Sequence, residues 1–161
     1  MPAYIWIFLA ILTLSHGAKK KDHKEILPRW DHEVYNGDHF DDIIMTSSQE
    51  VNIFTILVLY TLECRHLFDE YGIDHAHIPP TNFLIFAKHN YDKAKREPWY
   101  DLDPQWDLKA RYGNTDECFE VLFFNRSFTR ETKPLKWDPK NDLIFEQWLW
   151  SHMNVEVRQA L

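Results

Sequence analysis

The chain has 161 residues, of which 45% are hydrophobic and 16% aromatic, and its formal net charge is -7. This length favours one domain, and the aromatic content is enough for a large packed core. The acidic balance argues against nucleic acid as a partner, because phosphate binding is dominated by clustered lysine and arginine. The chain has only four glycines and no glycine-rich phosphate loop, so we expect no nucleotide and no other cofactor.

The first residues predict a secretory signal peptide. Tyr4–Leu14 is apolar and of signal-peptide length, and Ser15–Gly17 supplies small residues for cleavage. A membrane anchor would need about 18 to 20 apolar residues, which neither this run nor any later segment provides. We therefore expect a signal peptide at 1–17, a flexible charged lead-in at 18–29, and a mature chain without a membrane span in the secretory pathway, either in the ER lumen or secreted.

An alternating order of strands and helices is predicted after the lead-in. Trp30–Tyr35 alternates like a short strand, and a turn with N-cap residues then precedes a helix at His39–Met45. After the polar stretch Ser47–Glu50, the run Val51–Leu59 is nearly all apolar and β-branched. Such a run is typical of a central parallel strand that is buried on both faces.

The middle of the chain predicts a helix, a strand and an insertion. Apolar residues recur with helical spacing through Cys64–Tyr71, and Gly72 follows as a C-terminal cap. Thr81–Ala87 is typical of another buried strand, which completes a parallel β-α-β unit. The long polar segment Lys88–Leu102 is expected to be an insertion.

The last third predicts a helix, an antiparallel hairpin and a final helix. Asp103 and Pro104 offer an N-cap and a first-turn proline for the first helix. The expected ranges are Gln105–Tyr112 for that helix, Phe119–Phe124 and Leu135–Trp137 for the hairpin, residues 141–153 for the final helix, capped by Asn141 or Asp142, and 154–161 for a C-terminal tail. The whole order predicts one α/β domain at 30–153, a central mixed sheet flanked by helices.

Several short segments, taken in order, resemble the protein disulfide isomerase branch of the thioredoxin family from about Trp30 to Met153. The segments are YNGDHFD at Tyr35–Asp41, LVLY at Leu57–Tyr60, RYG at Arg111–Gly113 and VLFF at Val121–Phe124. The resemblance implies a thioredoxin-like fold. It also implies that CRHL at Cys64–Leu67 occupies the place of the family's C-x-x-C redox motif.

Two departures from the family pattern alter this active-site face. Leu67 replaces the second cysteine, so a dithiol oxidoreductase is not expected, because the mixed disulfide could not be resolved internally. The family's cis-proline position holds Phe119, where a cis bond would cost about 3 kcal/mol and a trans bond is expected. We therefore expect a changed face that includes Arg65, His66, Leu67 and Phe119, with a reshaped groove.

The two cysteines leave three interpretations open: a reactive thiol at Cys64, a buried core residue at Cys64, or a disulfide between Cys64 and Cys118. Cys64 at a helix N-terminus, beside Arg65 and His66, has features that lower a thiol pKa and favour a reactive thiolate, although Glu63 opposes them. Cys64 also shares the apolar face of its helix, as a buried core residue would. The family's fold would bring Cys118 near Cys64, and two cysteines in a secreted chain often form a disulfide.

Other motifs suggest a glycan but no metal. Asn125-Arg126-Ser127 is an N-x-S sequon at the mouth of the predicted hairpin, so a glycan on Asn125 is expected. His75 and His77, with His66 and Cys64 nearby in sequence, have a poor spacing for zinc or copper, and no metal site is expected.

The predicted insertion is both aromatic and basic. Its aromatic residues could widen the altered face as anchors for a partner, or pack the insertion onto the core. They are Tyr91, Trp99, Tyr100 and Trp106. Its basic residues are interrupted by acidic ones, which favours a solvated loop over a site for an anionic partner. They are Lys88, Lys93, Lys95 and Arg96.

These residues leave three functions open. The first is a non-catalytic thioredoxin-like protein of the ER lumen or secreted space that binds a protein partner through the altered active-site face. The second is a monothiol protein disulfide isomerase-like factor that captures client proteins through Cys64. The third is a structural or regulatory domain of a longer protein, because one fold hosts many functions.

Overall fold

The computed structural model describes residues 29–79, 82–98 and 106–160. The predicted signal peptide at 1–17 and all of the predicted lead-in except Arg29 lie outside the described residues. So do Trp99, Tyr100 and the expected cap Asp103-Pro104.

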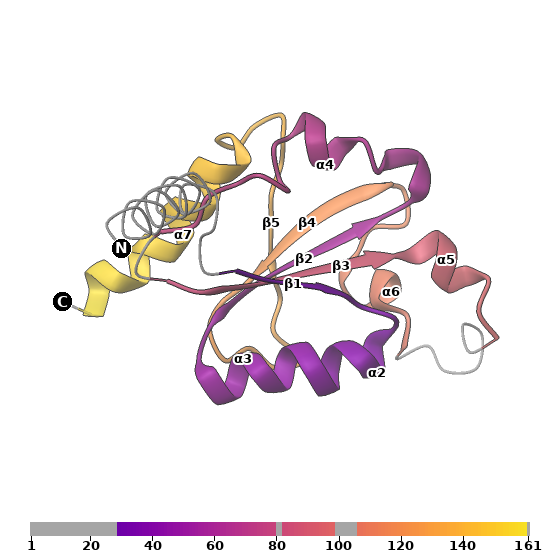
Figure 1. The fold of residues 1–161 in the computed structure, drawn as a ribbon, viewed down its shortest axis with the longest axis horizontal. Helices are drawn as coiled ribbons and strands as arrows, with labels where there is room; N and C mark the ends of the chain where they lie inside the picture. The colour runs from indigo at the N-terminus through magenta and orange to yellow at the C-terminus, as the bar shows by residue number, and fades with distance from the viewer. Residues whose placement is uncertain (1–28, 80–81, 99–105, 161) are drawn as a thin grey trace, which may run out of the picture.

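A mixed five-stranded sheet forms the centre of the domain (Figure 1). Its strand order is β1-β3-β2-β4-β5, in which β1, β3 and β2 are parallel while β4 and β5 run antiparallel to their neighbours. The strands are β1 (Arg29–Glu33), β2 (Phe54–Tyr60), β3 (Leu84–Asn90), β4 (Phe119–Phe124) and β5 (Leu135–Lys136). The α/β class with a central mixed sheet flanked by helices is therefore confirmed.

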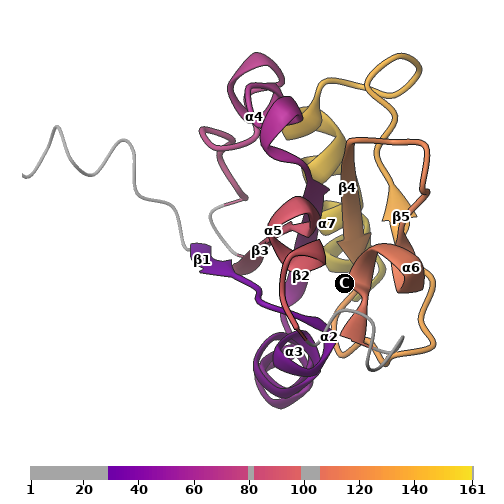
Figure 2. The same ribbon diagram turned by 90° about the vertical axis from the view of Figure 1, so that its right-hand side faces the viewer.

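Helices cover both faces of the sheet (Figure 2). On one face lies a continuous helical segment made of α2 (Gly37–His39), the π-helical η1 (Phe40–Met45) and α3 (Thr46–Val51). The other face carries the 3-10 turn η2 (Leu62–Cys64), α4 (Leu67–Glu70) and α7 (Phe145–Ala160). Two short helices, α5 (Tyr91–Lys95) and α6 (Leu108–Tyr112), complete the described elements.

Strand β2 divides two hydrophobic layers, as its apolar sequence predicts. All seven of its residues are buried. Phe54, Ile56 and Val58 pack toward α4 and α7, whereas Leu57 and Leu59 pack toward α2 to α3. Each such side chain contributes about 1.5 to 3 kcal/mol on burial, so the centre of the sheet is the most strongly stabilised part of the domain.

The first two boundaries differ from the expected ones because tertiary contacts override local patterns. The first helical segment continues to Val51, beyond the expected end at Met45, and stops at Asn52, which has a left-handed φ of 55°. The Ser48 hydroxyl donates a 2.7 Å hydrogen bond to the Ile53 carbonyl and fixes this end. Strand β2 therefore begins at Phe54, not at Val51.

Strand β3 continues through Lys88–Asn90, which the sequence placed in an insertion. Both neighbours extend it, because Glu33 of β1 pairs with Lys88 and Tyr60 of β2 pairs with Asn90. Pairing on both sides provides the hydrogen bonds that make a polar strand end stable. The predicted insertion is therefore three residues shorter at its start.

The helices of the second half also differ from their expected bounds. The continuous helix expected at Cys64–Tyr71 is a 3-10 turn followed by the separate α4. Helix α6 begins at Leu108, where the Asp107 side chain accepts a hydrogen bond from the Ala110 amide. Helix α7 begins at Phe145, since Asp142 instead closes a turn with the Asp138 amide at 2.7 Å. It runs to Ala160, so most of the expected tail is helical.

Candidate functional site

Cys64 and Cys118 meet where β2 ends and β4 begins. Their sulfur atoms lie at disulfide distance, and their Cα atoms are 6.0 Å apart, within the range that a disulfide needs. The Thr61 amide donates a 3.1 Å hydrogen bond to the Cys118 carbonyl, which aligns the two loops. Cys64 is buried, with 8% of its surface exposed. Cys64 therefore has no free thiol in this arrangement, and the reactive thiolate expected beside Arg65 and His66 is not present.

An apolar groove of about 260 Å³ lies beside Cys118. Leu67 and Phe119, both expected on the altered face, line it together with Tyr71 and Trp137. The ring of Phe119 lies 6.0 Å from that of Tyr71, which in turn lies 5.1 Å from that of Trp137. These aromatic contacts, together with the 2.9 Å hydrogen bond from the Trp137 indole to the Leu143 carbonyl, hold the groove in shape.

Arg65 and His66 face a different depression. They line a polar hollow of about 420 Å³ that shares no lining residue with the groove. The His66 ring contacts the Glu63 carbonyl at 3.1 Å and lies 3.9 Å from the Glu70 carboxylate. The four residues expected on one face therefore divide into two sites, because the chain turns between η2 and α4.

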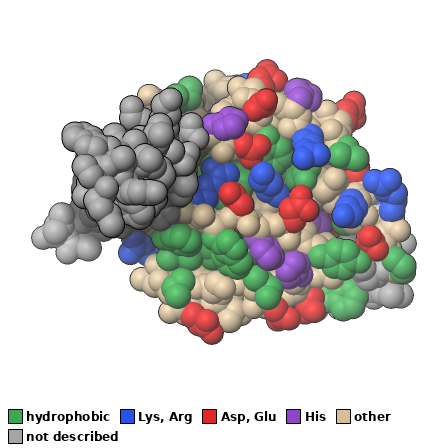
Figure 3. Space-filling model, in the orientation of Figure 1, with side chains coloured by type: hydrophobic (Ala, Val, Ile, Leu, Met, Phe, Trp, Pro, Cys, Tyr) green, Lys and Arg blue, Asp and Glu red, His purple; other side chains and the backbone are tan. Residues whose placement is uncertain are grey.

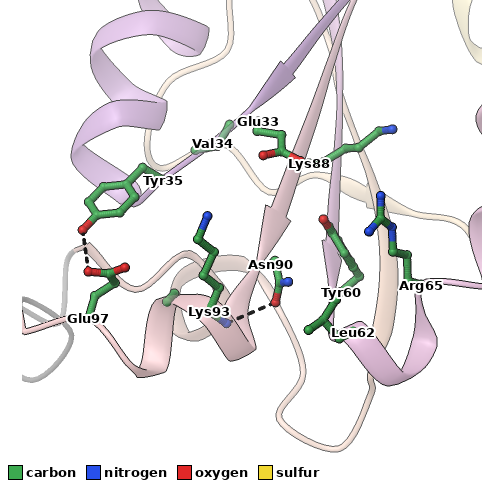
Figure 4. A pocket seen from close by; sticks show the side chains of 11 residues that line it. Glu33, Val34, Tyr35, Tyr60, Leu62, Arg65, Lys88, Asn90, Lys93 and Glu97 are labelled. Carbon is green, nitrogen blue, oxygen red and sulfur yellow. Dashed lines mark hydrogen bonds between the residues drawn. The ribbon is translucent and has the colours of Figure 1, made fainter.

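The polar hollow includes two residues that the sequence did not single out for a site, Glu33 and Tyr60. Glu33, Tyr60 and Lys88 come from the carboxyl ends of three parallel strands. A second hollow of about 320 Å³ adjoins it and shares these residues and Arg65 (Figure 4). The signal that could have found them is their position, since ligands of α/β sheets bind outside the carboxyl ends of parallel strands.

The basic and aromatic residues after β2 are not one exposed loop. Lys88 forms a 2.8 Å ion pair with Asp74, and Lys95 lies 5.5 Å above the Tyr91 ring. Tyr91 is buried and donates a 2.8 Å hydrogen bond to the Glu117 carbonyl. Burial raises its pKa to about 12. Tyr91 therefore packs α5 onto the domain and is not an exposed anchor for a partner.

A buried ion pair supports the start of β4. The Lys109 ammonium lies 2.6 Å from the Glu120 carboxylate, and both residues are buried. The Asn114 amide donates to both oxygens of the same carboxylate, at 2.8 and 3.0 Å. Removal of one partner from such a pair costs several kcal/mol, because the other charge is left buried. The pair thus anchors the loop that carries Cys118.

The sequon lies directly after β4. Asn125 is exposed, so its side chain is accessible for glycosylation. Ser127 has a left-handed φ of 55°, and its hydroxyl donates a 2.8 Å hydrogen bond to the Asn52 side chain. The expected glycan stays a prediction.

The two loop histidines are engaged by acidic residues. His75 lies 3.4 Å from Asp69, and His77 lies 3.0 Å from Glu146. Within residues 29–79, 82–98 and 106–160, no three His, Cys, Asp or Glu side chains are grouped so that they could hold a metal ion. In the same part of the chain, no helix has the length and apolarity to cross a membrane.

Comparisons with known proteins identified no relative of this chain. No family model, curated protein or solved structure matches the chain.

Proposed function

We propose that the chain is a non-catalytic thioredoxin-like protein of the ER lumen or secreted space that binds a protein partner through the groove beside Cys118. The mixed sheet with helices on both faces and an antiparallel last pair supports the thioredoxin-like fold. Secretory placement rests on the apolar segment at the start of the sequence.

The observation that carries the proposal is the open groove next to a paired Cys64. An exchange enzyme needs a free thiolate to attack its substrate, whereas Cys64 is buried and its sulfur contacts that of Cys118. Beside this closed position, Tyr71, Phe119 and Trp137 offer aromatic surface. Aromatic pockets of this kind are the usual hot spots of protein interfaces.

The charges around the groove indicate the partner's chemistry. Asp116 and Glu117 line it, and the Asp116 carboxylate has no ion-pair partner among the described residues. Glu117 is engaged by Lys136 at 2.5 Å. With a formal net charge of -7 on the chain, we expect a partner segment that inserts an apolar side chain and carries a lysine or arginine next to it.

The test is co-purification from secreting cells after chemical crosslinking. Leu67→Asp places a charge in the groove and should reduce partner recovery by about tenfold or more. The matched control is Leu62→Asp, an exposed leucine outside the groove, which should leave recovery unchanged. Equal recovery with both variants would contradict the proposal.

The double variant Cys64→Ser, Cys118→Ser separates the proposal from monothiol capture. Partner recovery should persist, because the partner binds the groove through apolar contacts and not through a thiol. If recovery is lost, and the native chain forms a mixed disulfide that disappears in Cys64→Ser alone, the monothiol alternative is correct instead. Circular dichroism of each variant checks that it is folded.

A further inference from the structure

The two adjoining hollows lie where the chain leaves the parallel strands toward opposite faces. After β1 the chain enters α2 on one face, and after β2 it enters η2 and α4 on the other face. This arrangement opens a crevice at the carboxyl ends of the strands, which is the usual ligand position in α/β sheets. The hollows measure about 320 and 420 Å³, the scale of a small-molecule site.

Tyr60 brings into this crevice a hydroxyl that is free to bind a ligand. The residue is 6% exposed, and its ring packs edge-on against Phe68 at 5.0 Å. Its hydroxyl has no hydrogen-bond partner among the described residues, although it lines both hollows. The hydroxyl is open to the crevice, so it can donate a hydrogen bond to a ligand there. Figure 4 shows this hydroxyl beside the Arg65 guanidinium, both pointing in the same direction.

Three charged groups of the crevice are also unpaired. Arg65, Lys93 and Glu33 line it, and none has an ion pair within the described part of the chain. Four other charged residues of the two hollows are engaged: Lys88 pairs with Asp74 at 2.8 Å, the Asp69 carboxylate lies 3.4 Å from His75, and Glu97 accepts a 3.0 Å hydrogen bond from Tyr35. Two cations and one anion are therefore left for a ligand.

Both signs of charge act on the Tyr60 hydroxyl. Burial is the main reason that the pKa of Tyr60 is raised, while Glu33 raises it further and Arg65 opposes the rise. Glu33 and Arg65 thus both lie close enough to act on this hydroxyl, and both line the two hollows. On the face shown in Figure 3, basic side chains lie among acidic ones and form no single basic patch.

We propose that this crevice binds an acidic amino acid, a small molecule with one ammonium and two carboxylates. One carboxylate accepts hydrogen bonds from Arg65 and Tyr60, the second pairs with Lys93, and the ammonium pairs with Glu33. A simple anion would leave Glu33 unpaired and repelling, and a simple cation would face Arg65 and Lys93. This site is separate from the groove beside Cys118. If the crevice does not bind an acidic amino acid, the proposed partner binding at the groove is not affected.

Isothermal titration of the full-length chain with three related probes tests the charge pattern. L-glutamate carries all three charges, L-glutamine lacks the second carboxylate, and glutarate lacks the ammonium. Saturable binding of glutamate should be about tenfold tighter than that of either other probe, because each lost charge removes one charge-assisted contact. If glutarate binds as tightly as glutamate, or if glutamate shows no saturable binding, the proposal is wrong.

Variants then assign the contacts. Tyr60→Phe keeps the packed ring and removes only the hydroxyl, so glutamate affinity should fall by about five- to tenfold. Arg65→Gln should weaken binding by about tenfold or more. The control Lys95→Gln removes an equal charge from α5 outside the crevice and should change affinity less than about twofold. Equal effects of Arg65→Gln and Lys95→Gln would show a general charge effect and overturn the assigned site.

Discussion

Gly113→Ala is expected to destabilise the domain, because the added Cβ atom would overlap with neighbouring atoms. A Cβ atom at Gly113 would lie 2.6 Å from an oxygen of Glu120, and 2.8 Å from both the Cδ atom and the backbone oxygen of Lys109. The backbone at Gly113 has a φ of -102°, which any residue can adopt. Backbone strain is thus not the cause, and the destabilising part of the effect must come from these contacts.

The neighbours cannot move away without loss. The Glu120 carboxylate is held by Lys109 at 2.6 Å and by the Asn114 amide at 2.8 Å. The Gly113 amide itself donates a 2.8 Å hydrogen bond to the Lys109 carbonyl. Overpacking costs about 1 to 3 kcal/mol, and a weakened hydrogen bond to a buried charge adds about 1 kcal/mol. The reduced entropy of the unfolded chain returns about 0.4 to 1 kcal/mol, so we expect a net loss of about 2 kcal/mol.

Urea denaturation followed by circular dichroism measures this loss. The matched control is Gly72→Ala, where no atom lies within 4 Å of the added Cβ but φ is +66°. That control should cost about 1 kcal/mol from backbone conformation alone. A Gly113→Ala loss below about 0.5 kcal/mol, or below that of the control, would refute the reasoning, because the ion pair would then yield easily.

Three further predictions follow from the same structure. Alkylation without reduction should leave the mass unchanged; two alkylated thiols would contradict the Cys64–Cys118 pair, whose removal should cost about 4 kcal/mol for a separation of 54 residues. Burial lowers the pKa of His89 below the ordinary histidine value of 6.5. The unfolded chain therefore binds more protons below about pH 6.5, and stability should be full above that pH and decrease as pH falls, with a shallower decrease in His89→Gln. The expected glycan predicts a gel shift after glycosidase treatment that Asn125→Gln abolishes; no shift in the native chain would contradict it.

The sequence predicted what depends on local pattern. Strand β2 was predictable because its run of consecutive apolar residues is longer than the alternating pattern of a half-exposed strand would contain. The same holds for β4. The end of β3 was missed because Lys88 and Asn90 are polar, and only pairing with β1 and β2 keeps them in a strand. Val51 was wrongly assigned to the strand. It is the last residue of α3, its apolar side chain is exposed, and Asn52 after it has a left-handed backbone.

The candidate site was predicted only in part. The approach of Cys64 to Cys118 followed from the family resemblance, and the structure places their sulfur atoms together. The division of Arg65 and Leu67 between two depressions could not be predicted, because it depends on a two-residue break between the 3-10 turn η2 and helix α4. The sequence indicates only that Tyr60 ends a strand, because nothing in a sequence shows that a hydroxyl has no hydrogen-bond partner.

The Cys64–Cys118 pair also has a mechanical consequence. It joins two neighbouring strands of the sheet across a separation of 54 residues that includes α4, β3, α5 and α6. If the protein is stretched from its two ends, an intact bond prevents this segment from extending. A fully extended segment of that size spans about 180 Å, so reduction should release about that much additional chain length in a single-molecule pulling experiment.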